Sequence, residues 1–78
     1  MEKELFLKVL IEDVFSESLE NIDFDTDFKA LDCWDSITSL TLIAIFDGEF
    51  STSLSGDDIR SATTINDLYQ LFINKTLA

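Results

Sequence analysis

The 78-residue chain contains no histidine, no proline, two glycines and one cysteine. Without histidine a Ser-His-Asp triad cannot form, so the activated serine of a hydrolase is excluded. The chain also lacks a glycine-rich loop that could cradle a phosphate, so nucleotide chemistry has no support. Without proline and with few glycines, little in the sequence interrupts a helix. These absences favour an all-α protein that is not an enzyme.

The single cysteine, Cys33, cannot form an internal disulfide, which favours a reducing, cytoplasmic setting. No apolar run approaches the roughly 20 residues that span a bilayer, and the opening "MEKELF" lacks the basic flank and long apolar core of a signal peptide. A chain of this length has room for one hydrophobic core. We therefore expect one domain over residues 1–78, cytoplasmic and monomeric, without membrane insertion.

Basic residues are also scarce, with five lysines and arginines against 16 acidic residues and a formal net charge of -11. Such a charge repels the phosphates of nucleic acids and the surfaces of anionic lipids. It favours encounter with positively charged protein surfaces. We expect protein partners with basic surfaces and no nucleic acid.

Apolar residues recur at helical spacing through residues 2–16, with Glu4, Lys8 and Glu12 on the polar side. This pattern predicts an amphipathic helix with a buried stripe of Leu5, Phe6, Val9, Leu10, Val14 and Phe15. Residues 17–35 keep neither helical nor strand spacing, yet they are too apolar for a free linker. We expect a long, ordered loop that is pinned to the core by Leu19, Ile22, Phe24, Phe28, Leu31 and Trp34.

A central helix is predicted over residues 36–50, because apolar residues repeat there at the spacing of one helical face. Leu42 and Ile45 widen this face, whose members are Ile37, Leu40, Ile43, Phe46 and Phe50. Gly48 is the weak point of the helix.

Two later stretches have the form Ser/Thr-x-x-Asp, in which each side chain can satisfy a free amide at the start of a helix. The pairs are Ser55 with Asp58 and Thr64 with Asp67. They predict a short helix near residues 56–61 and a longer one near residues 65–75. The buried face of the last helix is expected to consist of Ile65, Leu68, Leu71 and Phe72.

The acidic run "DFDTDF" offers an alternative, because Asp23, Asp25 and Asp27 match the first three ligand positions of an EF-hand calcium loop. The same loop would require glycine at the position of Phe28 and glutamate at that of Trp34. Solvated turn carboxylates are the ordinary explanation for half of such a motif. We therefore predict no metal site.

Taken in order, the features are an amphipathic helix, a long acidic loop, Asp-Ser-apolar opening a central helix, and a Thr-apolar-x-Asp start to a last helix. The motifs are "DSI" at 35–37, "DGEF" at 47–50 and "TTINDL" at 63–68. This arrangement resembles the acyl carrier protein family of phosphopantetheine-binding carrier domains over residues 2–75. The resemblance implies a small four-helix bundle with a long loop between helices 1 and 2 and a short third helix.

The resemblance further implies that a phosphopantetheinyl transferase attaches 4'-phosphopantetheine from coenzyme A to Ser36, and that Asp35 is the signature acid before it. The thiol of the arm would hold an acyl group as a thioester and present it to biosynthetic enzymes. Asp35 or Ser36 can also cap the helix, and Asp35 can do so while Ser36 is modified. An aminoacyl or peptidyl carrier, and an acidic interaction module without a prosthetic group, remain as alternatives.

Many relatives line the second helix with carboxylates that meet basic patches on partner enzymes, whereas this helix opens with hydroxyl side chains. We expect a partner surface of Ile37, Thr38, Thr41, Asp47 and Glu49, with simple solvation of the two threonines as the alternative. Ile37 replaces the usual leucine of the signature. The tryptophan at position 34 is similar to that of some stand-alone carriers outside core fatty acid synthesis.

Carriers of this family can shelter an acyl chain among the second, third and fourth helices. The matching positions, which a four-helix core needs equally, are Leu40, Ile43, Phe46, Leu54, Ile59, Ala62 and Leu68. We expect Trp34 to anchor the loop rather than to contact the acyl chain. Cys33 is expected to be a buried small hydrophobe, although its thiol could exchange with a nearby thioester.

Overall fold

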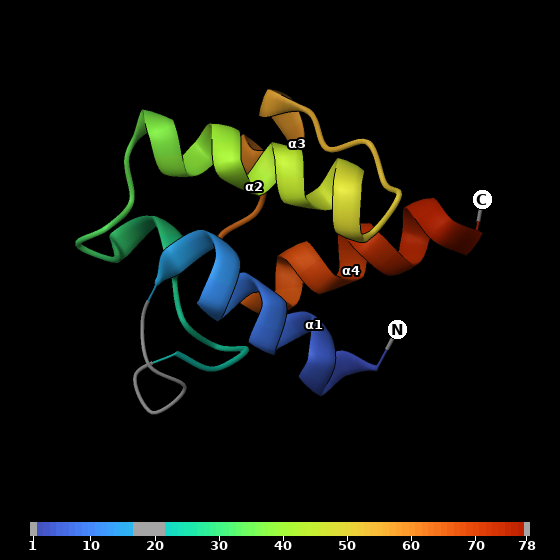
Figure 1. The fold of residues 1–78 in the computed structure, drawn as a ribbon, viewed down its shortest axis with the longest axis horizontal. Coiled ribbons are helices and arrows are strands. Elements are labelled where there is room, and N and C mark those ends of the chain that lie inside the picture. Colours follow the sequence, from blue (N-terminus) through green and yellow to red (C-terminus); the bar gives the residue numbers. More distant parts are fainter. Residues whose placement is uncertain (1, 17–21, 78) are drawn as a thin grey trace.

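The computed structural model describes residues 2–16 and 22–77, and these residues contain four α-helices and no strand. The helices are α1 (Lys3–Val9), α2 (Ser36–Glu49), α3 (Gly56–Ser61) and α4 (Ile65–Leu77) (Figure 1). The predicted all-α bundle, with a long first loop and a short third helix, is confirmed. The start of α2 lies at the opposite end of the molecule from the start of α1 and the end of α4 (Figure 1).

The sequence pattern predicts one α-helix over residues 2–16, but the first helix of the structure is not uniform. After Val9 it continues as a wider π-helical segment, Leu10–Phe15, and ends at Ser16 in the left-handed conformation with φ of 56°. A left-handed residue is a common way to end a helix. Leu5 is 48% exposed, so its place in the buried stripe was wrong.

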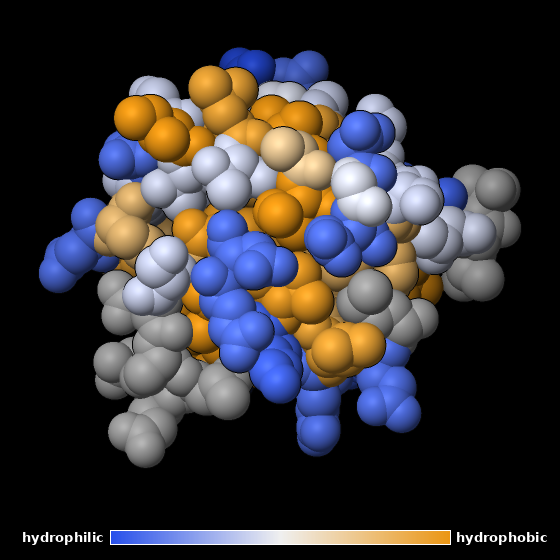
Figure 2. Space-filling view, in the orientation of Figure 1, coloured by the Kyte–Doolittle hydropathy of each residue, from blue (hydrophilic) through white to orange (hydrophobic). Residues whose placement is uncertain are grey.

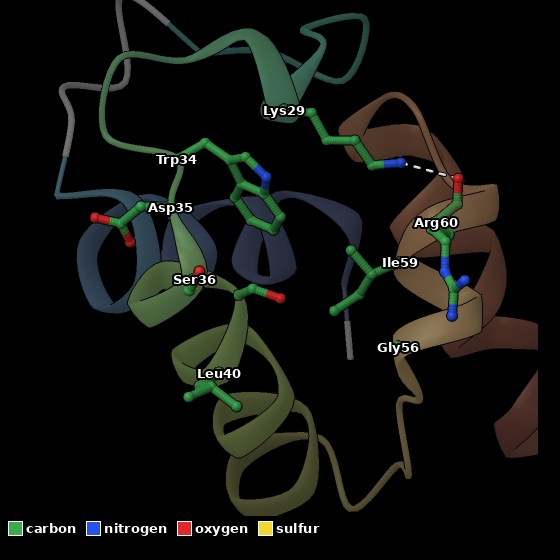
Figure 3. A pocket seen from close by; sticks show the side chains of 9 residues that line it. Lys29, Trp34, Asp35, Ser36, Leu40, Gly56, Ile59 and Arg60 are labelled. Atoms are coloured by element: carbon green, nitrogen blue, oxygen red, sulfur yellow. Dashed lines mark hydrogen bonds between the residues drawn. The ribbon is translucent and has the colours of Figure 1, made fainter.

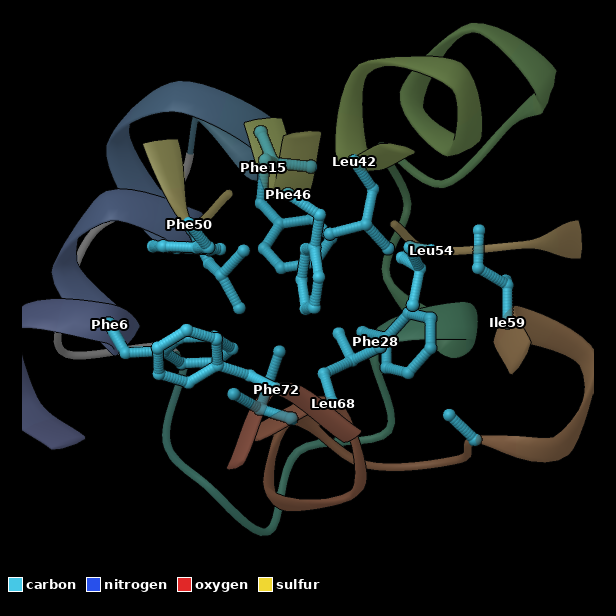
Figure 4. Close-up of a cluster of buried hydrophobic side chains, with 14 of the residues drawn as sticks. Phe6, Phe15, Phe28, Leu42, Phe46, Phe50, Leu54, Ile59, Leu68 and Phe72 are labelled. Atoms are coloured by element: carbon cyan, nitrogen blue, oxygen red, sulfur yellow. The ribbon is translucent and has the colours of Figure 1, made fainter. Parts of the chain in front are cut away.

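The core is built around the ring of Phe6, which brings α1 against α2 and α4 (Figure 4). It stacks on Phe50 and Phe72, with ring centroids 4.8 and 5.4 Å apart, and meets Phe46 edge-on at 5.8 Å. Each such aromatic pair contributes about 0.5–1.5 kcal/mol beyond the burial of its area. This cluster therefore fixes how the three longer helices pack.

The long loop is tied to the start of α4 by backbone hydrogen bonds. The amides of Ile65 and Asn66 donate to the carbonyls of Thr26 and Phe24, at 3.1 and 2.9 Å. These amides belong to the first turn of a helix, where no helical acceptor exists. The loop therefore completes the helix while the helix orders the loop.

Side chains of the loop reach the core, as predicted. Ile22 and Phe28 are buried, while Phe24, Leu31 and Trp34 are half-buried against the same cluster. The expected anchor Leu19 lies outside the described residues. The ordered loop is thus confirmed for residues 22–35.

Both predicted Ser/Thr-x-x-Asp starts are present as reciprocal caps. Ser55 and Asp58 exchange side-chain-to-backbone hydrogen bonds of 3.1 and 3.0 Å at the start of α3. Thr64 and Asp67 do the same at 3.2 and 3.0 Å at the start of α4. The face of α4 that was predicted to be buried consists of Ile65, Leu68, Leu71 and Phe72. Leu71 is half-buried and the other three are buried.

The central helix α2 buries Leu42, Phe46 and Phe50 and turns two other apolar side chains outward. Ile37 is 73% exposed and Leu40 is 67% exposed, so their assignment to the buried face was wrong. The helix is apolar on nearly every side, and packing against α1 and α4 decides which side is covered. Figure 2 shows the resulting apolar surface at the upper left, over the start of α2.

None of the helices in the described ranges is both long and apolar enough to cross a bilayer.

Candidate functional site

The start of α2 is capped by Asp35. This residue has extended backbone angles, and its Oδ1 accepts the backbone N–H of Thr38 at 2.8 Å. Its carbonyl accepts the first helical hydrogen bond, from Ser39 at 3.0 Å. The N–H of Thr38 lowers the pKa of the Asp35 carboxyl from its ordinary value, because the bond favours the charged form. Asp35 is therefore the cap, as one of the sequence alternatives proposed.

Ser36 is the first residue of α2, and its side chain is exposed. Its hydroxyl makes no hydrogen bond within the part of the chain that the structure describes. The first turn of a helix has amides without helical acceptors and carries the positive end of the helix dipole, which stabilise a nearby anion. With the capping role taken by Asp35, the hydroxyl of Ser36 is accessible to an incoming enzyme.

The segment before this serine is held by two interactions. The ring of Trp34 meets those of Phe28 and Phe15, with centroids 5.1 and 6.5 Å apart. The hydroxyl of Thr38 donates to the carbonyl of Cys33 at 2.7 Å. Trp34 thus anchors the loop, as expected from sequence. Cys33 is half-buried rather than fully buried.

An open pocket of about 720 Å³ lies beside Ser36, between α2 and α3 (Figure 3). Its size falls within the range of roughly 300–1,000 Å³ that small-molecule sites occupy. It is lined by Lys29, Trp34, Asp35, Ser36, Ser39, Leu40, Gly56, Ile59 and Arg60.

The seven residues proposed for an acyl cavity divide between this pocket and the core. Leu40 and Ile59 line the pocket, and Ile59 also belongs to the buried core. Ile43 is half-buried. The others are buried in the core and are Phe46, Leu54, Ala62 and Leu68. An acyl cavity formed by all seven stays a prediction.

The residues proposed for the partner surface are spread along α2. Ile37, Asp47 and Glu49 are exposed, whereas Thr38 and Thr41 are half-buried. The Thr41 hydroxyl donates to the carbonyl of Ile37 at 2.9 Å, so both threonine hydroxyls are bonded to backbone carbonyls. No charged residue occurs on α2 before Asp47. The surface that α2 itself presents between Ser36 and Asp47 is therefore uncharged and partly apolar.

Sequence reasoning missed the basic side of the pocket. Lys29 comes from the long loop and Arg60 from α3, and the ammonium of Lys29 donates to the carbonyl of Arg60 at 2.9 Å. The pocket-lining positions Ser39 and Gly56 were also not foreseen. Because basic residues are scarce in the sequence, each of them could have been considered as part of an anion site. Only the fold, however, brings Lys29 and Arg60 together near Ser36.

The acidic run of the loop caps turns. Asp23 accepts the N–H of Asp25 at 2.9 Å and the hydroxyl of Thr26 at 3.1 Å. Asp27 accepts the N–H of Lys29 at 3.0 Å. Among the residues with described positions, no three His, Cys, Asp or Glu side chains are grouped so as to hold a metal ion.

Comparison with protein families matches residues 6–72 to the model of the phosphopantetheine attachment site. Comparison with curated proteins and with solved structures gives no match. The site fits such a group, because an exposed serine hydroxyl stands at a helix start with an open pocket beside it. The chain therefore belongs to the phosphopantetheine-attachment family, whose members are non-catalytic carriers of covalently bound 4'-phosphopantetheine.

Proposed function

We propose that this protein is an acyl carrier protein that bears its phosphopantetheine arm on Ser36. The observation that carries the proposal is the exposed hydroxyl of Ser36 at the start of α2, in a chain of the phosphopantetheine-attachment family. Attachment replaces the adenosine bisphosphate of coenzyme A by the serine oxygen, with loss of the hydroxyl proton. The single cysteine suits the reducing conditions of the cytoplasm.

The surrounding residues hold this serine in place. Asp35 caps the helix and so spares the hydroxyl of Ser36 from that task. The Trp34 ring and the Thr38 hydroxyl fix the loop that leads into α2. When bound, the arm supplies a thiol that carries an acyl group as a thioester.

The partner surface that we propose keeps the residues expected from sequence and adds the exposed side chain of Leu40 to that of Ile37. A partner enzyme would cover these two side chains while it reaches Ser36. A role of Thr38 and Thr41 in partner choice stays a prediction. Asp47 and Glu49, at the far end of the helix, would meet basic residues of the partner. The transferase that adds the arm would use the same surface, since it must approach the same hydroxyl.

Incubation with coenzyme A and a broad-specificity phosphopantetheinyl transferase, followed by intact mass spectrometry, tests the proposal. We expect the mass to rise by one phosphopantetheine. Ser36→Ala should prevent the increase. Ser39→Ala, which removes a hydroxyl from the same pocket one turn along the helix, should leave it unchanged. An unmodified wild-type chain, or modified Ser36→Ala, would refute the assignment.

A further inference from the structure

The pocket beside Ser36 is electrically asymmetric. Asp35 lies with Ser36 on the α2 side, whereas Lys29 and Arg60 lie on the α3 side (Figure 3). Two of only five basic residues in the chain thus line one pocket. The aspartates of α3 are not among the lining residues, and Asp57 pairs with Arg60 and Asp58 with Lys75. The positive charge that can draw an anion into the pocket therefore comes from the lining cations.

Of the two cations, Lys29 is the more available for binding an anion. Its side chain is half-buried, and its ammonium is positioned by the 2.9 Å hydrogen bond to the carbonyl of Arg60. That bond uses one of three donors. The charge of Lys29 also acts on Asp67, whose pKa it helps to lower, but no carboxylate in the described ranges lies within ion-pair distance of the Lys29 ammonium. The guanidinium of Arg60, in contrast, is 80% exposed and already paired with Asp57.

Trp34, which was expected from sequence only to anchor the loop, supplies a second donor. Its indole nitrogen points toward the space between α2 and α3 (Figure 3) and donates to no acceptor in the described part of the chain. Leu40 and Ile59 supply apolar walls. The pocket thus combines apolar walls with the donor groups of Lys29 and Trp34, the kind of lining that can orient a small ligand.

We propose that this pocket holds a carboxylate-bearing acyl cargo, with the cargo carboxylate at the ammonium of Lys29 and the indole N–H of Trp34. The inference rests on the proposed function, since the cargo arrives on the arm of Ser36. The arm would have its phosphodiester at Ser36, on the same side as Asp35, so a second anion would be repelled from there and drawn toward Lys29. A positively charged aminoacyl group would be drawn the opposite way, which favours the acyl over the aminoacyl carrier.

A matched pair of cargoes tests this inference. The transferase is supplied with succinyl coenzyme A or with its neutral succinamyl analogue, and intact mass verifies each loaded protein. Because Trp34 is the only tryptophan, its indole N–H gives a single resonance in a ¹⁵N–¹H spectrum. We expect the succinyl cargo to shift this resonance, and higher salt to reduce the shift. Neither the succinamyl cargo nor the unloaded arm should reproduce it.

Lysine variants sharpen the test. Lys29→Gln should abolish the succinyl-dependent shift, whereas Lys8→Gln, which removes the same charge from an exposed position on α1, should retain it. Equal shifts with the charged and neutral cargoes, or with the arm alone, would assign the donors to the arm itself and overturn the inference. An unshifted resonance in the succinyl protein would also overturn it. A failure of the mass to increase would instead refute the proposed function on which the inference rests.

Discussion

The two faces of α2 contain similar side chains and have different roles. On the inner face Leu42 and Phe46 are fully buried and Phe50 is 5% exposed. On the outer face Ile37 and Leu40 are 73% and 67% exposed. The difference arises from the neighbours of each face, since the inner one meets the aromatic cluster of α1 and α4. Hydrophobicity alone thus does not say whether a residue holds the fold or faces a partner.

The largest expected difference between the faces is in stability. Phe46→Ala should lower the free energy of unfolding by about 3–5 kcal/mol, because it leaves a cavity among packed rings. Leu40→Ala should change it by less than about 0.5 kcal/mol, since the side chain is already in solvent. Urea unfolding followed by circular dichroism measures both. Similar losses in the two variants would show that the outer face is packed after all.

For recognition by the transferase, substitutions on the outer face of α2 are expected to have the larger effect. Leu40→Asp should lower kcat/KM for arm transfer about tenfold, because a charge would be buried against the partner where an apolar side chain was covered. Its urea midpoint should stay near that of the wild type. Transfer rates from coenzyme A, measured by mass spectrometry over time, test this. Ala44→Asp places the same charge at an exposed position one helical turn beyond Leu40, and it is the control for a general effect of charge on this helix.

If both variants slow the transfer equally, charge on the helix rather than contact at Leu40 accounts for the loss. If neither slows it, the partner surface lies elsewhere.

The comparison of the two faces also shows which features could be predicted from the sequence. The caps at Ser55 and Thr64 were predictable because their hydrogen bonds join residues three positions apart. The exposure of Leu40 was not, because α2 offers apolar residues on most sides and only the packed bundle selects one. The pairing of Lys29 with Arg60 spans 31 positions of sequence, and no local pattern signals it.

A smaller effect is expected at the start of α4, the helix on which the inner face packs. Thr64→Ala removes the hydroxyl that accepts the N–H of Asp67, and should cost about 1 kcal/mol of stability. Thr63→Ala is the matched control, because Thr63 contributes only its backbone N–H to the same carboxylate. Thermal unfolding of the two variants should separate them. Equal melting temperatures would exclude a stabilising role for the Thr64 cap.

The smallest expected effect is the pH dependence of this cap. The N–H groups of Thr64 and then Thr63 lower the pKa of Asp67 from its ordinary value of 3.8 in the folded chain. Ionised Asp67 therefore favours folding, and its contribution is complete above that value and is lost as the pH falls through the lowered pKa. Asp67→Asn should weaken the decline in melting temperature between pH 5 and pH 2. Asp13→Asn, on the exposed side of the π-helical segment, should not.

The central claim is that the exposed start of α2 presents Ser36 as the attachment point. Tandem mass spectrometry of the chain after reaction with coenzyme A and the transferase tests it most directly, because the fragments locate the added group. The structure predicts the group on Ser36, with Ser39 in the same pocket unmodified. A group found on any other residue, or no group at all, would contradict the account.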